Sequence, residues 1–269
     1  MGQPTAAVRE VAIVQETQEG LAATAVSDVA RDYAWLVDVL PLPPARLLDA
    51  GCGAGVVSEW LTSLGYRVTA IDADPDAVAR ARAAGVPAIQ ANLADYADQP
   101  FDAVLMLLTM HHMHPLPHVL DTVTRLLRPG GRLIVDEFAW DWADQATIRW
   151  FDDIAAILVA VGAADPAAGP LSPVDPLAEG GQADRAGRWR ARHTEHGTVC
   201  NPGDTMVRQV VERFGEVEVR RVPYLSRHLV SGQAHPAVFA ELSRIEHEHI
   251  ADGTLTATGF RIIAQQPLA

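Results

Sequence analysis

The alternation of strand-like and helix-like segments between residues 46 and 137 is the feature that most constrains the fold. Residues 46–50, 67–71 and 102–108 are apolar runs of strand length, and the segments between them place apolar side chains at helical spacing. Strands that alternate with helices form parallel sheets with right-handed crossovers. The pattern therefore predicts an α/β fold with a doubly wound, mostly parallel sheet.

Strand and helix patterns continue to the end of the chain and predict a seven-stranded sheet. The predicted strands are residues 46–50, 67–71, 87–91, 102–108, 132–135, 217–223 and 256–265. The predicted helices are residues 55–64, 76–84, 117–127, 142–161, 205–214 and 236–251.

This organisation predicts a single domain over residues 1–269. Residues 162–187 are rich in Ala, Pro, Gly and Asp and offer little to a core, so we expect a mobile segment there, with a lid as one interpretation. The predicted parts are an N-terminal helical segment (1–45), a cofactor-binding core (46–137), a helical cap between the fifth and sixth strands (138–204) and the C-terminal part of the sheet (205–269).

A glycine-rich turn follows the first predicted strand, in the sequence Leu47-Leu48-Asp49-Ala50-Gly51-Cys52-Gly53-Ala54-Gly55. Glycines at this edge of a sheet let the backbone approach a ligand closely. A dinucleotide-binding turn has the spacing Gly-x-Gly-x-x-Gly, whereas Val56 occupies the position of the last glycine here. Asp49 would repel a pyrophosphate but suits an ammonium or sulfonium group. A cationic cofactor is therefore favoured, and a nicotinamide-dependent oxidoreductase is the alternative.

Further motifs follow this turn in the order found in one known family. They are Val68-Thr69-Ala70-Ile71-Asp72, Gln90-Ala91-Asn92-Leu93-Ala94-Asp95, Pro100-Phe101-Asp102-Ala103-Val104 and Leu126-Leu127-Arg128-Pro129-Gly130-Gly131. Together they resemble the motifs of class I S-adenosylmethionine-dependent methyltransferases. The resemblance implies a Rossmann-like fold and transfer of the methyl group of S-adenosyl-L-methionine to an acceptor, with S-adenosyl-L-homocysteine as product. A protein that binds this cofactor without catalysis is a second alternative.

The resemblance also implies which residues bind the cofactor. Asp72 ends the second strand, 21 positions after Gly51 (72 − 51), and can accept hydrogen bonds from both ribose hydroxyls. Asn92 stands where the family usually has an Asp that contacts the adenine amino group, and Asp95 is the nearby substitute. The implied contacts come from Asp49, Gly51, Cys52, Gly53, Gly55, Asp72, Ala73, Asn92, Leu93 and Leu108.

Histidines follow the fourth predicted strand, in the sequence Thr109-Met110-His111-His112-Met113-His114. Because His exchanges protons near neutral pH, His112 and then His111 are candidates for a base that acts on the methyl acceptor. Packing under the loop is the alternative for either ring. No carboxylate or Cys stands at a supporting spacing, so no metal site is predicted.

Three other charged segments are of interest. Asp136 and Glu137 end the fifth strand, where alternation predicts that only one of them points inward, and Glu137 is a candidate catalytic residue. His196 is a further candidate in the polar segment 189–196, which we otherwise expect to be a solvated face. Residues 246–249 alternate Glu and His and are expected at the surface.

Composition limits the partners. The chain has a formal net charge of −13, and all 21 of its Lys and Arg residues are Arg, which disfavours binding to nucleic acid. Two Cys residues form no disulfide framework, and the N-terminal residues have neither a signal-peptide pattern nor a membrane span. We therefore expect a cytoplasmic monomer or homodimer that acts on a small organic acceptor, and the sequence leaves the methylated atom open.

Overall fold

The computed structural model describes residues 8–11, 28–163, 185–195, 198–229 and 236–268. The chain divides into two compact units: Met1–Glu137 with Thr205–Arg220 and Arg261–Ala269, and Phe138–Asp204 with Arg221–Phe260. The single domain with an inserted cap stays a prediction. Most of the predicted mobile segment, residues 164–184, lies outside the described residues.

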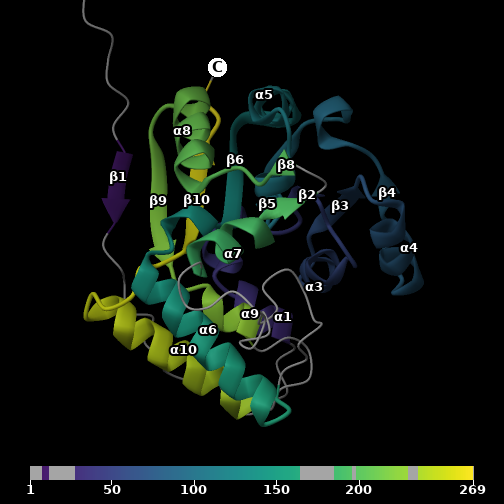
Figure 1. Ribbon diagram of the computed structural model, residues 1–269. Helices are drawn as coiled ribbons and strands as arrows, with labels where there is room; N and C mark the ends of the chain where they lie inside the picture. The colour runs from purple at the N-terminus through teal and green to yellow at the C-terminus, as the bar shows by residue number, and fades with distance from the viewer. Residues whose placement is uncertain (1–7, 12–27, 164–184, 196–197, 230–235, 269) are drawn as a thin grey trace, which may run out of the picture. The chain divides into compact units, whose positions relative to one another are not determined.

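Within the described residues, eight strands form one sheet in the order β1-β9-β10-β6-β5-β2-β3-β4 (Figure 1). Seven of these strands and the doubly wound α/β fold were predicted, and both predictions are confirmed. The strands are β1 (Val8–Val11), β2 (Arg46–Ala50), β3 (Arg67–Asp72), β4 (Ile89–Gln90), β5 (Phe101–Leu107), β6 (Leu127–Phe138), β9 (Val217–Val222) and β10 (Gly259–Gln265).

Two features of the sheet differ from the prediction. β1 pairs in parallel with β9 in a segment that was expected to be helical. β6 begins at Leu127 rather than at Arg132, because the expected turn at Gly130 lies within the strand. There the register against β5 shifts between Phe101 and Ala103, and the Gly130 amide donates to the carbonyl of Gln266 at 3.0 Å. An irregularity of this kind lets a strand accommodate a turn-forming sequence.

The central strands bring several strand ends to one edge of the sheet. β6, β5, β2, β3 and β4 are successive neighbours, and each adjacent pair is parallel. In register, Leu107 of β5 lies opposite Asp136 of β6, and Ala50 of β2 lies opposite Ile71 of β3. The glycine turn, the end of β3 and the segment after β5 therefore meet the end of β6 along this edge.

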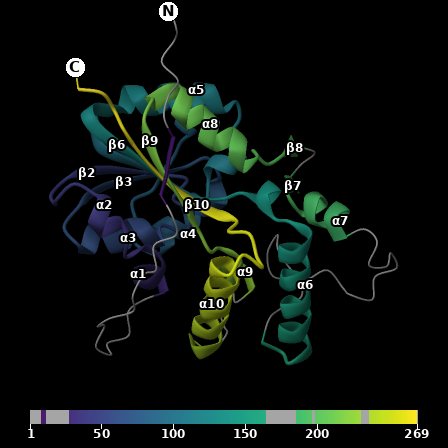
Figure 2. The ribbon, with the colours of Figure 1, turned by 90° about the vertical axis from the view of Figure 1, so that its left-hand side faces the viewer.

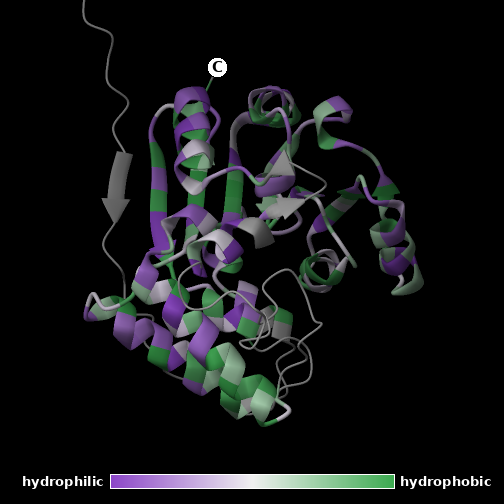
Figure 3. Cartoon of the chain, in the orientation of Figure 1, coloured by the Kyte–Doolittle hydropathy of each residue, from purple (hydrophilic) through white to green (hydrophobic). Residues whose placement is uncertain are grey.

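Helices cover both faces of the sheet, with α5 and α8 over one face and α2 and α3 over the other (Figure 2). Leu47, Leu61, Leu105 and Ile134 are fully buried in one core cluster, and much of β6 is coloured as hydrophobic (Figure 3). The helices of this unit are α1 (Asp28–Tyr33), α2 (Leu36–Val39), α3 (Val56–Ser63), α4 (Pro75–Ala83), α5 (Leu116–Leu126) and α8 (Gly203–Phe214), with short turns η1 (Leu93–Asp95) and η2 (Met110–His112).

The second unit is mainly helical. An aromatic cluster in it includes Phe138, which stacks on Tyr224 with ring centroids 4.7 Å apart, and Trp140, which stacks on His193 at 5.7 Å. Its elements are η3 (Trp140–Trp142), α6 (Gln145–Ala160), α7 (Arg185–Arg192), β7 (Thr194–Glu195), β8 (Thr198–Val199), α9 (Leu225–Leu229) and α10 (Pro236–Ala251). No helix in the described part of the chain is long and apolar enough to cross a lipid bilayer.

Two expectations about the surface of this unit are wrong. His193 and Trp189 were placed on a solvated face but are buried, because their rings pack against one another and against Phe138. Glu246 was expected at the surface, yet it is 1% exposed and accepts hydrogen bonds from the backbone amides of residues 224–226. These amides begin α9, so the carboxylate caps that helix.

Candidate functional site

The glycine turn between β2 and α3 has a backbone that few residues other than glycine adopt. Gly51, Gly53 and Gly55 have φ angles of 82°, 56° and 81°, all in the left-handed region. The amides of Gly51 and Cys52 both donate to the carbonyl of Ile71, at 2.9 and 3.0 Å, which ties the turn to β3. The turn predicted from the glycine spacing is therefore present at the carboxyl edge of the sheet.

The three glycines differ in what a side chain would meet. A Cβ at Gly51 would overlap the side chain of Thr109, and a Cβ at Gly55 would lie 3.0 Å from Val86. A Cβ at Gly53 would meet no atom within 4 Å. Gly51 and Gly55 are thus required by the packing of the protein itself, whereas the space above Gly53 is open to a ligand.

Asp72 lies at the end of β3, beside this open position. One of its carboxylate oxygens accepts a hydrogen bond from the amide of Gly53 at 2.8 Å, and the other accepts from the amide of Asp74 at 2.9 Å. Both oxygens keep acceptor capacity, since each carboxylate oxygen has two lone pairs. Asp72 therefore shapes the turn and adds negative charge next to it. A contact to a ribose stays a prediction.

Asp49 is buried and contacts a helix rather than open space. It is 2% exposed and accepts a hydrogen bond from the hydroxyl of Ser58 in α3 at 2.6 Å. Burial raises the pKa of Asp49 to about 6; the Ser58 hydrogen bond opposes this shift and the charge of Asp72 adds to it. A second carboxylate close to Asp72 makes the turn a poor place for a pyrophosphate and a suitable one for a cation.

Cys52 is not a nucleophile in this turn. Burial and, to a smaller extent, the charges of Asp49 and Asp72 together raise the pKa of its thiol to about 12. The thiol is therefore protonated at neutral pH and acts as a small side chain.

Asn92 and its neighbours form a capped turn after β4. The side-chain oxygen of Asn92 accepts a hydrogen bond from the amide of Ala94 at 3.0 Å and so caps η1. Asn92 and Ala73 are exposed, whereas Leu93 is 4% exposed and packs into the core. An exposed Asn92 is compatible with the predicted contact to adenine, which stays a prediction.

Leu108 has a backbone conformation that is common only for glycine. Its φ of 56° lies in the left-handed region, which is costly for a branched side chain. Its amide donates to the carbonyl of Asp136 at 2.8 Å, and Thr109 packs next to Gly51. The unusual backbone therefore occurs where the chain leaves β5 between the glycine turn and the end of β6.

Glu137 and His111, predicted separately, are in contact. Oε2 of Glu137 lies 2.7 Å from Nδ1 of His111, while Oε1 accepts from the amides of Met110 at 2.5 Å and His111 at 3.3 Å. The Glu137 side chain is fully buried and the His111 side chain is 17% exposed. Glu137 at the end of β6 thus contacts His111, whose side chain is partly exposed at the carboxyl edge of the sheet.

The other catalytic candidates are placed differently. His112 is exposed, and its ring centroid lies 3.9 Å from that of His111. His196 lies outside the described residues. Asp136 and Glu137 are both fully buried, because Glu137 caps η2 while Asp136 lies 3.4 Å from Arg261 of β10. The expectation that only one of them points inward stays a prediction.

Arg261 is a residue that sequence reasoning missed. Its guanidinium contacts Asp136 and also lies 4.2 Å from the centre of the Trp35 ring. An Arg in the last apolar strand was the available signal, since a charge there needs a buried partner. Among the described residues, no group of three or more His, Cys, Asp or Glu is arranged to hold a metal ion.

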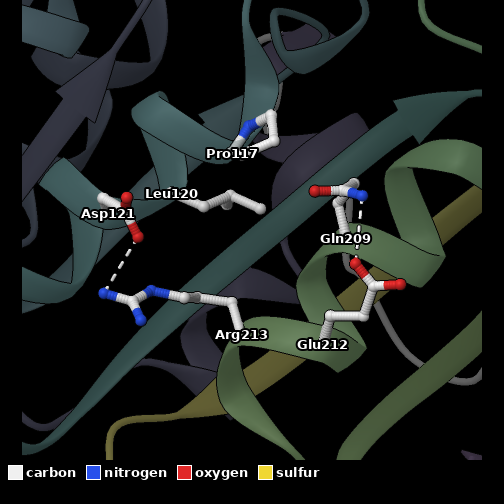
Figure 4. Close-up of a pocket in the computed structure, with 6 residues that line it drawn as sticks. All are labelled: Pro117, Leu120, Asp121, Gln209, Glu212 and Arg213. Carbon is white, nitrogen blue, oxygen red and sulfur yellow. Dashed lines mark hydrogen bonds and ion pairs between the residues drawn. The ribbon is translucent and has the colours of Figure 1, made fainter.

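A separate hollow lies between α5 and α8 (Figure 4). Its polar groups pair with one another: Arg213 binds Asp121 at 3.0 Å, and Gln209 binds Glu212 at 3.0 Å. Pro117 and Leu120 complete its lining. None of the predicted site residues lines this hollow, so it is separate from the candidate site.

The matched family model is described as a methyltransferase domain and covers residues 48–135. A relative named ubiquinone biosynthesis O-methyltransferase, from Xylella fastidiosa, is 38% identical over 121 residues, which are 41% of this chain and 48% of the relative. One of the same name from Xanthomonas oryzae pv. oryzae is 37% identical over 105 residues, 36% of this chain and 44% of the relative. This chain thus spans about half the length of the curated relatives that it matches.

Solved structures extend the likeness of the fold beyond this segment. An S-adenosylmethionine-dependent methyltransferase from Mesorhizobium loti matches with a TM-score of 0.54 and 20% identity, covering 88% of this chain and 99% of that one. One from Methanosarcina mazei matches with a TM-score of 0.50 and 19% identity over the same shares. The fold is therefore shared along most of the chain, at low identity.

Proposed function

We propose that this chain is a class I S-adenosylmethionine-dependent methyltransferase that transfers a methyl group from S-adenosyl-L-methionine to a small organic acceptor. The match of residues 48–135 to a methyltransferase domain and the fold shared with solved methyltransferases support this. The alternative of a nicotinamide-dependent oxidoreductase is disfavoured, because the family match covers the glycine turn itself. The cofactor supplies an electrophilic methyl group on a sulfonium, and the protein supplies binding, orientation and charge.

The observation that carries this proposal is the opening above Gly53 with Asp72 beside it. A ligand can approach the Gly53 backbone because no protein atom lies where a side chain would be. The carboxylate of Asp72 is fixed next to that opening by the amides of Gly53 and Asp74. A nucleoside with ribose hydroxyls and a positive charge matches these groups, which supports the proposal.

The individual binding roles belong to the proposal. Asp72 would hold the ribose, and Asn92 with Leu93 would border the adenine, since Asn92 is exposed beside the buried Leu93. Asp49 would act through charge, because its side chain is committed to Ser58. The other proposed contacts come from Gly51, Cys52, Gly55, Ala73 and Leu108.

The acceptor and the cellular setting are also proposals. The relatives are named O-methyltransferases, which supports a small molecule with a hydroxyl group as acceptor. The net charge of −13 argues against nucleic acid. The chain has only two Cys residues, too few for a disulfide framework, which supports a cytoplasmic location, and we propose a monomer or homodimer with residues 138–204 as a cap.

A binding experiment tests the proposal first. A ligand that binds the folded state raises its melting temperature, so S-adenosyl-L-homocysteine should do so and NAD or NADP should not. Incubation with methyl-labelled S-adenosyl-L-methionine and a panel of phenols, alcohols and amines then separates an enzyme from a protein that only binds the cofactor. Stabilisation by NAD but not by S-adenosyl-L-homocysteine would refute the proposal.

A further inference from the structure

Asp49 is an acid that the protein keeps out of water at the start of the glycine turn. It is 2% exposed, and one of its carboxylate oxygens accepts a hydrogen bond from the hydroxyl of the buried Ser58 at 2.6 Å. The other buried residues of β2 are Leu47, Leu48 and Ala50, so an acid is the exception in this strand. Ionisation of a carboxylate in such a place is costly, because the protein replaces the water that would solvate the charge.

A second acid, Asp72, stands on the same face of the sheet. In the parallel pairing of β2 with β3, Asp49 lies opposite Ala70, and Asp72 follows Ala70 by two positions. Residues two apart on a strand share a face, so the two carboxylates are diagonal neighbours on adjacent strands. Burial and, to a smaller extent, the charge of Asp72 raise the pKa of Asp49 to about 6, although the Ser58 hydrogen bond lowers it.

The protein supplies Asp49 with no balancing positive charge in the part of the chain that the structure describes. Ser58 faces it from α3 and Asp72 from β3, and neither is a cation. Cys52 of the glycine turn lies nearby, and because the pKa of its thiol is raised to about 12 by burial and by these two acids, it stays neutral. The charge of Asp49 is therefore balanced either by a proton or by a positive ligand.

We propose that Asp49 distinguishes the cofactor from the product by charge. It is ionised beside the sulfonium of S-adenosyl-L-methionine, and it takes up a proton from water when the neutral thioether of S-adenosyl-L-homocysteine occupies the site. This inference rests on the proposed function and adds regulation of the same site by pH. Methyl transfer removes one positive charge from the nucleoside, so the two ligands act differently on a carboxylate that is shielded from water.

The direction of the pH effect follows from this difference. Below pH 6 most Asp49 side chains carry a proton, which the cofactor must displace to water before it gains the attraction of the carboxylate. The product has no charge on sulfur and displaces no proton. Acid therefore weakens binding of the cofactor relative to the product. The amino and carboxylate groups are common to both ligands, so their own titration cancels in the ratio of the two affinities.

Proton release on binding measures this effect directly. Calorimetric titration in buffers of different ionisation enthalpy reports the number of protons that leave the protein with each ligand. If the sulfonium weakens the hold of Asp49 on its proton about tenfold, the cofactor should release about 0.4 proton per site at pH 6. The product should release none. The ratio of the two affinities should move about fivefold toward the cofactor between about pH 5 and 7.5.

Asp49→Asn removes the charge while keeping the shape and an oxygen that can accept from Ser58. Cofactor and product should then release equal numbers of protons at pH 6, and the ratio of their affinities should not depend on pH. Asp74→Asn is the matched control, because Asp74 is an exposed acid and Asn replaces it well as the cap of α4. It should keep the wild-type difference. A difference that persists in Asp49→Asn would overturn the role of Asp49.

Ser58→Ala tests the same role without removing the acid. Its hydroxyl donates a hydrogen bond that lowers the pKa of Asp49, so loss of the hydroxyl should raise that pKa. The pH at which the cofactor releases most protons should therefore move upward. An unchanged pH of greatest release would overturn the inference, even where Asp49→Asn does not fold.

The outcomes separate this inference from its premise. If the wild type binds neither ligand, the proposed function fails. If it binds both and they release equal numbers of protons at pH 6, charge sensing by Asp49 is overturned and the proposed function stands.

Discussion

Glu137 in the first unit and Glu246 in the second use the same arrangement for different ends. Each is buried, and each accepts three hydrogen bonds at the start of a short helical turn. All partners of Glu246 are backbone amides, whereas one partner of Glu137 is the ring of His111. A buried carboxylate thus stabilises a local turn in both units, and the one at Glu137 also contacts a partly exposed side chain.

The glycine turn repeats this contrast over three positions. At position 51 only glycine fits, because a side chain would overlap that of Thr109. The missing side chain at this position therefore allows the protein to pack. A Cβ at Gly53 would meet no protein atom within 4 Å, so the missing side chain at this position leaves room for a ligand. Substitutions that separate loss of stability from loss of binding therefore test the comparison.

Gly51→Ala should have the largest effect. The new methyl group would overlap Thr109, and the left-handed φ of 82° adds strain, so the free energy of unfolding should fall by about 4 kcal/mol or more. Chemical denaturation with a fluorescence readout measures this. A variant as stable as the wild type would show that the turn differs from the one described.

Glu246→Ala should have the second-largest effect on stability and should leave cofactor binding unchanged. Three buried amides would lose their acceptor, which should cost about 3 kcal/mol. Thermal unfolding should show the loss, while S-adenosyl-L-homocysteine binds the folded variant as before. Glu248→Ala is the matched control, because Glu248 is exposed and pairs with Arg244 at the surface. Equal effects of the two variants would contradict the buried cap.

Asp49→Asn should change how stability depends on pH. The pKa of Asp49 is about 6 in the folded chain and near 3.8 when unfolded, so the folded state holds this proton more tightly. Stability from this group is present below pH 4 and is lost as the pH rises through 6, by about 2–3 kcal/mol. Denaturation at a series of pH values should show that loss in the wild type and its absence in the variant. Parallel curves would refute the assigned pKa.

Gly53→Ala should have the smallest effect on stability. The φ of 56° costs about 1 kcal/mol for Ala, and the methyl group meets no protein atom. The same methyl group would occupy the space reserved for the ligand, so affinity for S-adenosyl-L-homocysteine should fall at least about tenfold. Calorimetry on the folded variant decides this, and undiminished affinity would place the ligand elsewhere.

The sequence predicted the fold where the constraints are local. The strand ending at Ala50, the glycine turn and the strand ending at Asp72 follow from spacing within a few residues, and they are where they were expected. The partner of Glu137 could not be predicted in this way, because it is the turn at Met110, 27 positions away in the chain.

Residues that act over long separations were the ones missed. Glu246 was assigned to the surface because its partners lie about 20 positions earlier in the chain, where no periodic pattern links them to it. His193 was assigned to a solvated face because its neighbours in sequence are polar. The rings of Phe138 and Trp140 that contact it come from a distant part of the chain. The contact between His111 and Glu137 likewise required the sheet to bring two strand ends together.

Calorimetric titration of S-adenosyl-L-homocysteine into the wild type and Asp72→Ala tests the central claim most directly. The account predicts saturable, one-to-one binding to the wild type and an affinity lower by at least about tenfold for the variant, at a melting temperature that shows the variant to be folded. No uptake by the folded wild type, or equal affinity in both proteins, would contradict it.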